Sequence, residues 1–116
     1  MSENTISTQV TSYSMGKPGR TLNTARNNHF VIDSPTLGEA LGSGEAFLAG
    51  VSSCGVTLIE GAAQRTGVSL PRLEVGIEGI RSTDRPMDFQ RVTMRFTFTG
   101  VSRQQADELV RTYQAN

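Results

Sequence analysis

The chain has 116 residues, with 11 basic and 11 acidic side chains and a formal net charge of zero at pH 7. This length predicts one domain spanning residues 1–116, and the neutral charge argues against nucleic-acid binding, which draws affinity from neutralising phosphates. The single Cys excludes an intramolecular disulfide, and with it the class of small disulfide-stapled secreted domains.

Neither a signal peptide nor a membrane span is expected. The opening segment alternates polar residues with single apolar ones and contains no apolar run of signal-peptide length. The longest apolar-rich stretch, Ala46 to Ala63, is interrupted by glycine, serine, threonine and glutamate residues, so it falls short of a membrane span. We therefore expect a cytoplasmic protein without membrane contact, a compartment in which a free thiol is stable.

Residues 3–33 predict strands and turns. Ile6, Thr8 and Val10 alternate with polar residues, which favours an extended edge segment. A turn signal at residues 16–19 precedes a second predicted strand at residues 20–26. A turn at Asn27 and Asn28 then leads into a short strand at residues 29–32, which the segment at residues 33–35 ends. Together these segments predict a three-stranded meander.

A glycine-rich connection over residues 36–44 leads into a long predicted helix. This helix runs from about Glu45 to Arg65 and is closed by Gly67, the residue type expected just beyond a helix C-terminus. Apolar residues lie on most of its sides, which predicts a buried helix.

Two strands and a second helix complete the predicted fold. Residues 73–78 and 90–98 alternate as half-buried strands, separated by a polar loop at residues 82–88. Ser102 and Gln105 fit a capping box at the start of the last helix, which is still running at Asn116. The order βββ-α-ββ-α indicates an α+β domain with antiparallel sheets packed on a long central helix.

Cys54 lies in the middle of the predicted central helix and allows two interpretations. Free Cys is often a buried and inert small residue, which makes Cys54 a packing residue. However, Gly50 and Gly61 share its helical stripe and lower helix stability by about 1 kcal/mol each relative to Ala. Such glycines favour the close approach of another backbone, which would place the thiol at an interface.

A reactive thiol also needs a nearby cation, metal or helix N-terminus to lower its pKa. Cys54 lies too deep in the helix for the dipole alone, so Lys17, Arg20 and Arg26 of the meander are the candidate cations, although each fits a solvated strand residue equally well. Glu45 is a candidate to orient such a cation. Nine residues of continuous helix, however, would turn Glu45 half a turn away from Cys54.

No metal or cofactor site is expected from the sequence. The chain has one His and one Cys, which cannot supply the ligands of a structural zinc site. Phosphate-binding loops of the P-loop type and dinucleotide fingerprints are absent from the sequence.

Several segments, in order, resemble the OsmC/Ohr family of organic hydroperoxide reductases, in its OsmC-like branch. Residues 26–35 (RNNHFVIDSP) resemble a family strand, and residues 45–54 (EAFLAGVSSC) resemble the family helix with the same nine-residue step from Glu to Cys. Residues 63–68 and 73–75 resemble the following helix exit and strand. The likeness extends from about Gly16 to Asn116.

The resemblance implies an intertwined homodimer with the thiol at the subunit interface. Cys54 would be the peroxidatic thiol that reduces an organic hydroperoxide and becomes a sulfenic acid. In the family a second Cys then closes a disulfide that an external dithiol reduces. Glu45 matches the carboxylate that orients the family's activating Arg. Alignment of the GKPGR segment places Lys17 at the position of that Arg and Arg20 three residues further on.

The sequence departs from the family pattern in three ways. The family's second Cys normally follows the last helix, so it would be expected after Asn116, and the chain is expected to lack this C-terminal tail. Ser43 or Gly44 stands where a Pro usually precedes the Glu, and Lys17 replaces an Arg.

These departures leave two other functions open. One is a non-catalytic OsmC-like dimer that binds a small apolar or electrophilic ligand at the subunit interface. The other is a purely structural dimer in which Cys54 fills space between helices. A slowly alkylated thiol favours the ligand-binding dimer, whereas rapid labelling below pH 7 favours the peroxidase. A Cys54→Ala variant that changes stability but no ligand or redox property favours the structural dimer.

Overall fold

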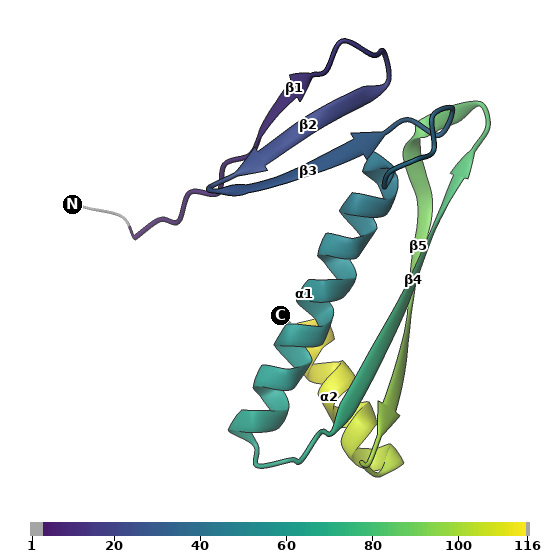
Figure 1. The fold of residues 1–116 in the computed structure, drawn as a ribbon. Helices are drawn as coiled ribbons and strands as arrows, with labels where there is room; N and C mark the ends of the chain where they lie inside the picture. The colour runs from purple at the N-terminus through teal and green to yellow at the C-terminus, as the bar shows by residue number, and fades with distance from the viewer. Residues whose placement is uncertain (1–3, 116) are drawn as a thin grey trace. The chain divides into compact units, whose positions relative to one another are not determined.

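The structure is a computed structural model that describes residues 4–115. Its order of elements is the predicted βββ-α-ββ-α, so the α+β class with antiparallel sheets is confirmed. The elements are β1 (Thr11–Ser14), β2 (Arg20–Ala25), β3 (Asn28–Asp33), α1 (Ser43–Arg65), β4 (Arg72–Ser82), β5 (Arg85–Thr99) and α2 (Arg103–Ala115) (Figure 1). Contacts divide the chain into an N-terminal unit that ends at Ala46 and a C-terminal unit that begins at Phe47.

The N-terminal unit contains the predicted meander as an antiparallel sheet in the order β1-β2-β3. The prediction was wrong for residues 6–10, because β1 begins only at Thr11. Thr11 pairs with Thr24, and β2 ends one residue later at Ala25. Residues 4–9 therefore extend past the β2–β3 hairpin and have no partner strand in this sheet.

The β2–β3 turn lies one residue earlier than predicted. Ala25 pairs directly with Asn28, so the two-residue loop is Arg26 and Asn27 rather than Asn27 and Asn28. Arg26 takes a φ of 56°, a conformation that side-chain-bearing residues seldom adopt. The Asn28 side chain closes the loop by donating a hydrogen bond of 3.1 Å from Nδ2 to the Ala25 carbonyl oxygen.

Helix α1 begins two residues before the predicted start and ends where predicted. At its beginning, the Glu45 carboxylate accepts a hydrogen bond of 2.8 Å from the Gly42 amide, which is half of a capping box. At its end, Gly67 has a φ of 73°, and the amide of Val68 donates to the Ala63 carbonyl at 2.9 Å. This Schellman-type closure satisfies a carbonyl that the helix leaves unpaired.

The prediction that α1 is buried was wrong for the single chain. Only Gly55, Ile59, Ala62 and Ala63 are buried, all on the side that packs within the C-terminal unit. Within the described residues, α1 is also long and apolar enough to cross a membrane by length and composition alone, contrary to the expectation from its interruptions. Core helices of soluble proteins have the same composition, so this property does not distinguish the two environments.

The C-terminal unit contains an antiparallel ribbon of β4 and β5. Both strands are longer than predicted, and the expected loop at residues 82–88 was wrong, because β5 begins at Arg85 and Ser82 pairs with it. The polar residues of this region concealed the strand, and register shifts between Ile80 and Ser82 break the alternation that would have revealed it.

A small core joins α1 to α2 inside the C-terminal unit. Ile59, Ala62 and Ala63 of α1 meet Leu109 of α2, and all four are buried. The predicted capping box of α2 is confirmed in both directions, by hydrogen bonds of 3.0 Å from the Ser102 amide to Gln105 Oε1 and 3.1 Å from the Gln105 amide to Ser102 Oγ. The core residues packed around this cluster are Val68, Leu70, Leu73, Phe96, Phe98 and Tyr113.

Candidate functional site

Cys54 lies in the middle of α1, and its thiol is free and exposed. The interpretation of Cys54 as a buried packing residue therefore does not hold within one chain. The nearby hydrogen bond of 3.1 Å from Thr57 Oγ1 goes to the backbone carbonyl of Cys54 and leaves the sulfur untouched. The thiol is thus open to a reagent or to another surface.

Cys54 belongs to an exposed stripe of α1 that we call the outer face, defined as Phe47, Gly50, Cys54 and Leu58. Phe47 is 57% and Leu58 46% exposed, high values for large apolar side chains. A Cβ built at Gly50 would have nothing within 4 Å, so the close approach predicted for this glycine is not made inside the chain. The glycine that does pack tightly is Gly55, where a Cβ would lie 3.1 Å from Met94 Cε.

Glu45 has a local partner in the structure. Its carboxylate binds the Gly42 amide and thereby holds the connection that leads into α1. It lies nine residues before Cys54 on the same continuous helix, a spacing that turns the two side chains half a turn apart. The structure therefore assigns Glu45 a helix-capping contact.

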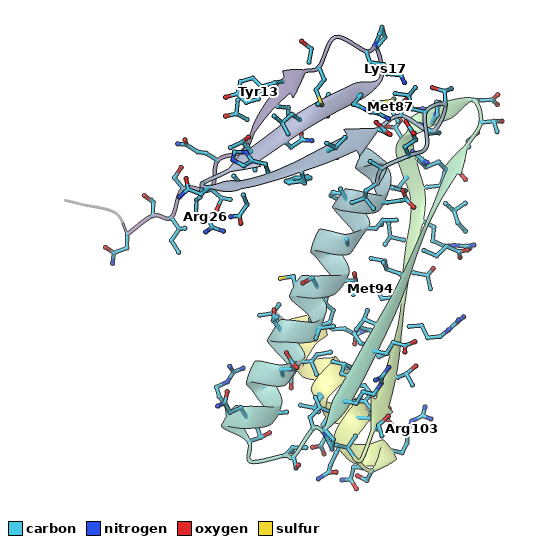
Figure 2. All side chains as sticks on the ribbon, in the orientation of Figure 1. Tyr13, Lys17, Arg26, Met87, Met94 and Arg103 are labelled. Atoms are coloured by element: carbon cyan, nitrogen blue, oxygen red, sulfur yellow. The ribbon has the colours of Figure 1, made fainter. Side chains whose placement is uncertain are left out.

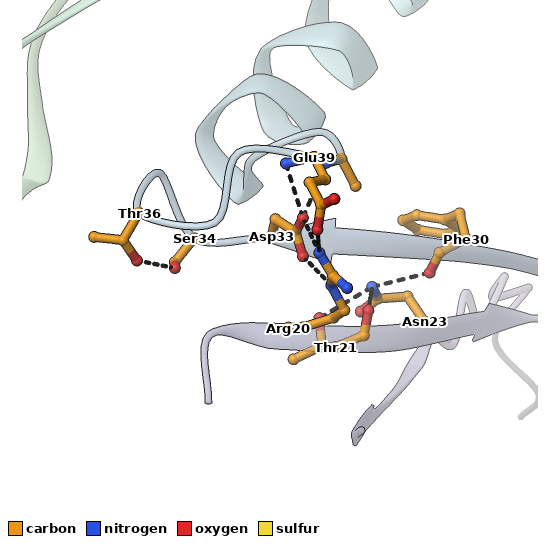
Figure 3. A network of polar contacts seen from close by, with 9 residues as sticks. Arg20, Thr21, Asn23, Phe30, Asp33, Ser34, Thr36 and Glu39 are labelled. Atoms are coloured by element: carbon orange, nitrogen blue, oxygen red, sulfur yellow. Dashed lines mark hydrogen bonds and ion pairs between the residues drawn. The ribbon is translucent and has the colours of Figure 1, made fainter. Parts of the chain in front are cut away.

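Arg20 forms the central ion pair of the N-terminal unit (Figure 3). Its Nε lies 2.6 Å from Asp33 Oδ1, and its Nη2 lies 2.9 Å from Asp33 Oδ2 and 2.6 Å from Glu39 Oε1. Arg20 and Asp33 are directly opposed in the β2–β3 register, which brings their side chains to the same face. Both carboxylates raise the pKa of the Arg20 guanidinium, with the hydrogen bond to Asp33 as the largest cause.

Asp33 is the residue that sequence reasoning missed. Its side chain is fully buried and also accepts hydrogen bonds from the amides of Glu39 at 3.1 Å and Ala40 at 2.9 Å. The hydrogen bond from Arg20 is the main cause that lowers the pKa of Asp33 from 3.8 to about 2. Asp33 thus ties β2, β3 and the connection to α1 together, a role that became visible only with the strand register.

The remaining basic candidates lie at opposite ends of the three-stranded sheet. Lys17 occupies the β1–β2 turn and Arg26 the β2–β3 turn (Figure 2). Lys17 is exposed beside a shallow cavity of about 430 Å³ that Tyr13, Gly19 and Arg20 also line. Among residues 4–115, no ion pair is formed by Lys17 at the distances of a salt bridge. One ligand cannot contact both ends, so Lys17 and Arg20 form one candidate group and Arg26 another.

Residues 4–115 contain no group of three His, Cys, Asp or Glu side chains placed to hold a metal ion. The chemistry that the described side chains offer is that of one exposed thiol, with cations and carboxylates in the N-terminal unit.

Comparison with known proteins defines the class to which this fold belongs. No family model matches the sequence, and no curated protein matches it either. Solved structures do match over nearly the whole chain. An OsmC-like protein from Mycoplasma pneumoniae is 14% identical, with a TM-score of 0.83 over 96% of this chain and 82% of that one.

Two proteins named for organic hydroperoxide resistance share the same fold. OsmC of Legionella pneumophila is 18% identical, with a TM-score of 0.74 over 97% of this chain and 85% of that one. OhrB of Bacillus subtilis is 19% identical, with a TM-score of 0.69 over 95% of this chain and 84% of that one. The chain therefore has the fold of the OsmC and Ohr proteins, as the sequence resemblance predicted.

Proposed function

We propose that this protein reduces organic hydroperoxides with Cys54 as the peroxidatic thiol, as one OsmC-like domain in a homodimer. The observation that carries the proposal is the position of Cys54, the only Cys of the 116-residue sequence, free and exposed in the middle of α1. The fold is shared with proteins named for organic hydroperoxide resistance, which supports the same chemistry here. A reducing cytoplasm is the compartment that this proposal requires.

In the first step the Cys54 thiolate attacks the peroxide. A bond forms between Sγ and the distal oxygen while the O–O bond breaks, and the departing alkoxide takes up a proton to become an alcohol. The peroxide is reduced by two electrons, and Cys54 is oxidised to a sulfenic acid.

We assign the second step to an external dithiol, since Cys54 is the only Cys among these 116 residues. A thiolate of an external dithiol attacks the sulfenic sulfur, forming a mixed disulfide and releasing water. The second thiolate of the same donor then attacks the donor sulfur of the mixed disulfide. This step closes a disulfide within the donor and releases the Cys54 thiolate. The products are the oxidised donor and the Cys54 thiol.

We assign activation of Cys54 to Lys17. Arg20 is already held by Asp33 and Glu39 within the N-terminal unit, and Glu45 caps α1, which leaves Lys17 as the cation at the same turn without an ion pair among residues 4–115. A neighbouring ammonium group would favour the thiolate over the thiol. Lys17 lacks the planar fork of Arg, so it would act as a point charge.

The homodimer is supported by the outer face of α1. Leu58 is exposed beside Cys54, Phe47 is exposed although its ring stacks on Phe89 at 5.9 Å, and the missing side chain at Gly50 permits close approach of a second helix. Burial of this face against another copy would place Cys54 at the subunit interface. The same interface would also be the binding site in the alternative function, a non-catalytic dimer that binds a small apolar or electrophilic ligand.

Peroxidase activity is tested by comparing the wild-type chain with Cys54→Ser. We expect the wild type to consume cumene hydroperoxide in the presence of dithiothreitol, and Cys54→Ser to fall to the uncatalysed rate. Ser53→Ala is the matched control, because Ser53 is the exposed neighbour on the same helix and should leave the rate unchanged. Equal, background-level consumption by wild type and Cys54→Ser would reject the peroxidase and favour a non-catalytic dimer.

The assignment of Lys17 predicts a change in thiol reactivity. Lys17→Met should slow the alkylation of Cys54 by iodoacetamide at pH 6 by about tenfold, because the thiolate loses the neighbouring positive charge that favours it. Lys17→Arg should retain most of the rate, and Arg26→Met, at the other end of the sheet, should retain all of it. An unchanged alkylation rate in Lys17→Met would exclude Lys17 from the site.

A further inference from the structure

Met87 is the most exposed methionine in the part of the chain that the structure describes. Its side chain is 91% exposed, whereas Met15 is 46% exposed and Met94, on the same strand β5, is half-buried (Figure 2). Met87 is also absent from the residues that pack around the core of the C-terminal unit. The thioether sulfur of Met87 is therefore open to reagents in solution.

The register of the β4–β5 ribbon accounts for the exposure of Met87. Register shifts between Ile80 and Ser82 leave residues 86–88 outside the paired ladder, with Met87 at their centre. A side chain in a regular antiparallel pair is flanked by the side chain directly opposite on the partner strand. Met87 has no such cross-strand neighbour, so the ribbon leaves it uncovered.

The two residues next to Met87 are each held by a side-chain contact. The carbonyl oxygen of Pro86 accepts a hydrogen bond of 3.2 Å from Arg81 Nη1. On the other side, Asp88 Oδ2 lies 2.8 Å from Arg85 Nη2 in an ion pair. These contacts hold the backbone on both sides of Met87 and favour its outward position.

Met94 has the opposite environment on the same strand. Its sulfur accepts a hydrogen bond of 3.5 Å from the Tyr113 hydroxyl. Its methyl group packs against Gly55 of α1, where a Cβ would lie 3.1 Å from Met94 Cε. Oxidation of a thioether uses a sulfur lone pair and needs space for the added oxygen, and both are restricted at Met94. Strand β5 thus carries one open thioether and one shielded thioether.

We propose that Met87 is a second site of reaction with organic hydroperoxides, at which the thioether is oxidised to methionine sulfoxide. The sulfur attacks the distal peroxide oxygen, so that an S–O bond forms while the O–O bond breaks. The proton of the distal oxygen passes to the departing alkoxide, which leaves as an alcohol. The sulfur loses two electrons and the peroxide gains them, so the step needs no other reactant. It proceeds without Cys54 and lies outside the proposed peroxidase cycle.

The test treats the full chain with excess tert-butyl hydroperoxide, without a dithiol, and follows oxygen gain in tryptic peptides by mass spectrometry. Cleavage after Arg91 places Met87 and Met94 in different peptides. We expect Met87 to be oxidised at least about tenfold faster than Met94, because reaction at Met94 requires loss of its hydrogen bond and its packing. In concentrated urea the two rates should converge, which would attribute the difference to the folded structure.

Two variants serve as matched controls. Tyr113→Phe removes the hydroxyl that donates to Met94 and keeps the aromatic ring, so Met94 should be oxidised faster while Met87 keeps its wild-type rate. Met87→Leu should abolish oxygen gain in the peptide of residues 82–91, which contains no other sulfur-bearing residue.

Equal oxidation rates of Met87 and Met94 in the folded chain would overturn the inference. Resistance of Met87 in the concentrated wild type would also overturn it, since the side chain would then be covered in the assembled protein. Cys54→Ser separates this inference from the proposed function, because Met87 should be oxidised at the wild-type rate in a chain without the peroxidatic thiol. A wild type that lacks peroxidase activity but oxidises rapidly at Met87 would reject the proposed function alone.

Discussion

Replacing Asp33 with alanine should lower the thermal unfolding midpoint of the N-terminal unit by roughly 10 °C or more. The Asp33 carboxylate accepts hydrogen bonds from Arg20 through two nitrogens and from the amides of Glu39 and Ala40, all within one buried site. Its removal leaves these donors without their acceptor and separates β3 from the connection to α1. Far-UV circular dichroism of the full chain measures the midpoint.

Glu39→Ala is the matched control for Asp33→Ala. Both residues pair with Arg20, but the Glu39 side chain is 71% exposed, whereas that of Asp33 is 0% exposed. Exposed ion pairs contribute little to stability because water solvates their charges. We therefore expect Glu39→Ala to remain near the wild-type midpoint. Equal losses in the two variants would contradict the central position given to Asp33.

The stability that Asp33 provides should depend on pH in a defined range. Its pKa is about 2 in the folded chain against an ordinary value of 3.8, so the folded state binds fewer protons than the unfolded state between these values. The contribution is complete above about pH 4 and is lost as the pH falls through 2. The difference in unfolding midpoint between wild type and Asp33→Asn should shrink over that range. A constant difference down to pH 2 would contradict this origin.

Local signals predicted most of the fold. Gly67 marked the end of α1, and Ser102 with Gln105 marked the start of α2, because a helix terminus leaves particular backbone groups to be satisfied by particular residues. The sequence did not predict the paired tip of the β4–β5 ribbon, because no local signal marks it. Its polar residues look like a loop, and the strand continues only because each residue has a cross-strand partner that the sequence of one strand does not reveal.

The candidate site was predictable only in part. The central helix with Cys54 followed from spacing, but the exposure of Cys54 did not, since an apolar helix surface can face its own chain or another. The ion pair of Arg20 with Asp33 joins residues 13 apart in the sequence through the β2–β3 register. Because Asp33 and Glu39 hold Arg20, the structure distinguishes Arg20 from Lys17 as a candidate cation, which the sequence alone did not do.

Adjacent residues of α1 separate folding from self-association. Ile59→Ala should lower the free energy of unfolding by about 2–5 kcal/mol, because Ile59 is 0% exposed and its truncation leaves a cavity among Ala62, Ala63 and Leu109. Urea denaturation, followed by far-UV circular dichroism at a concentration below dimerisation, measures this loss. A cost under about 1 kcal/mol would mean that the core collapses onto the smaller side chain.

Leu58→Ala removes a similar volume one residue away and should behave differently. Leu58 is 46% exposed on the outer face, so the monomer should lose little stability when it is truncated. If two copies bury this face around Cys54, the same change should weaken the dimer at least about tenfold. If Leu58→Ala leaves the dimer dissociation constant unchanged, the outer face of α1 is not part of the dimer interface. Cys54 would then remain an exposed thiol in the assembled protein, and its reactivity would have to be explained within a single subunit.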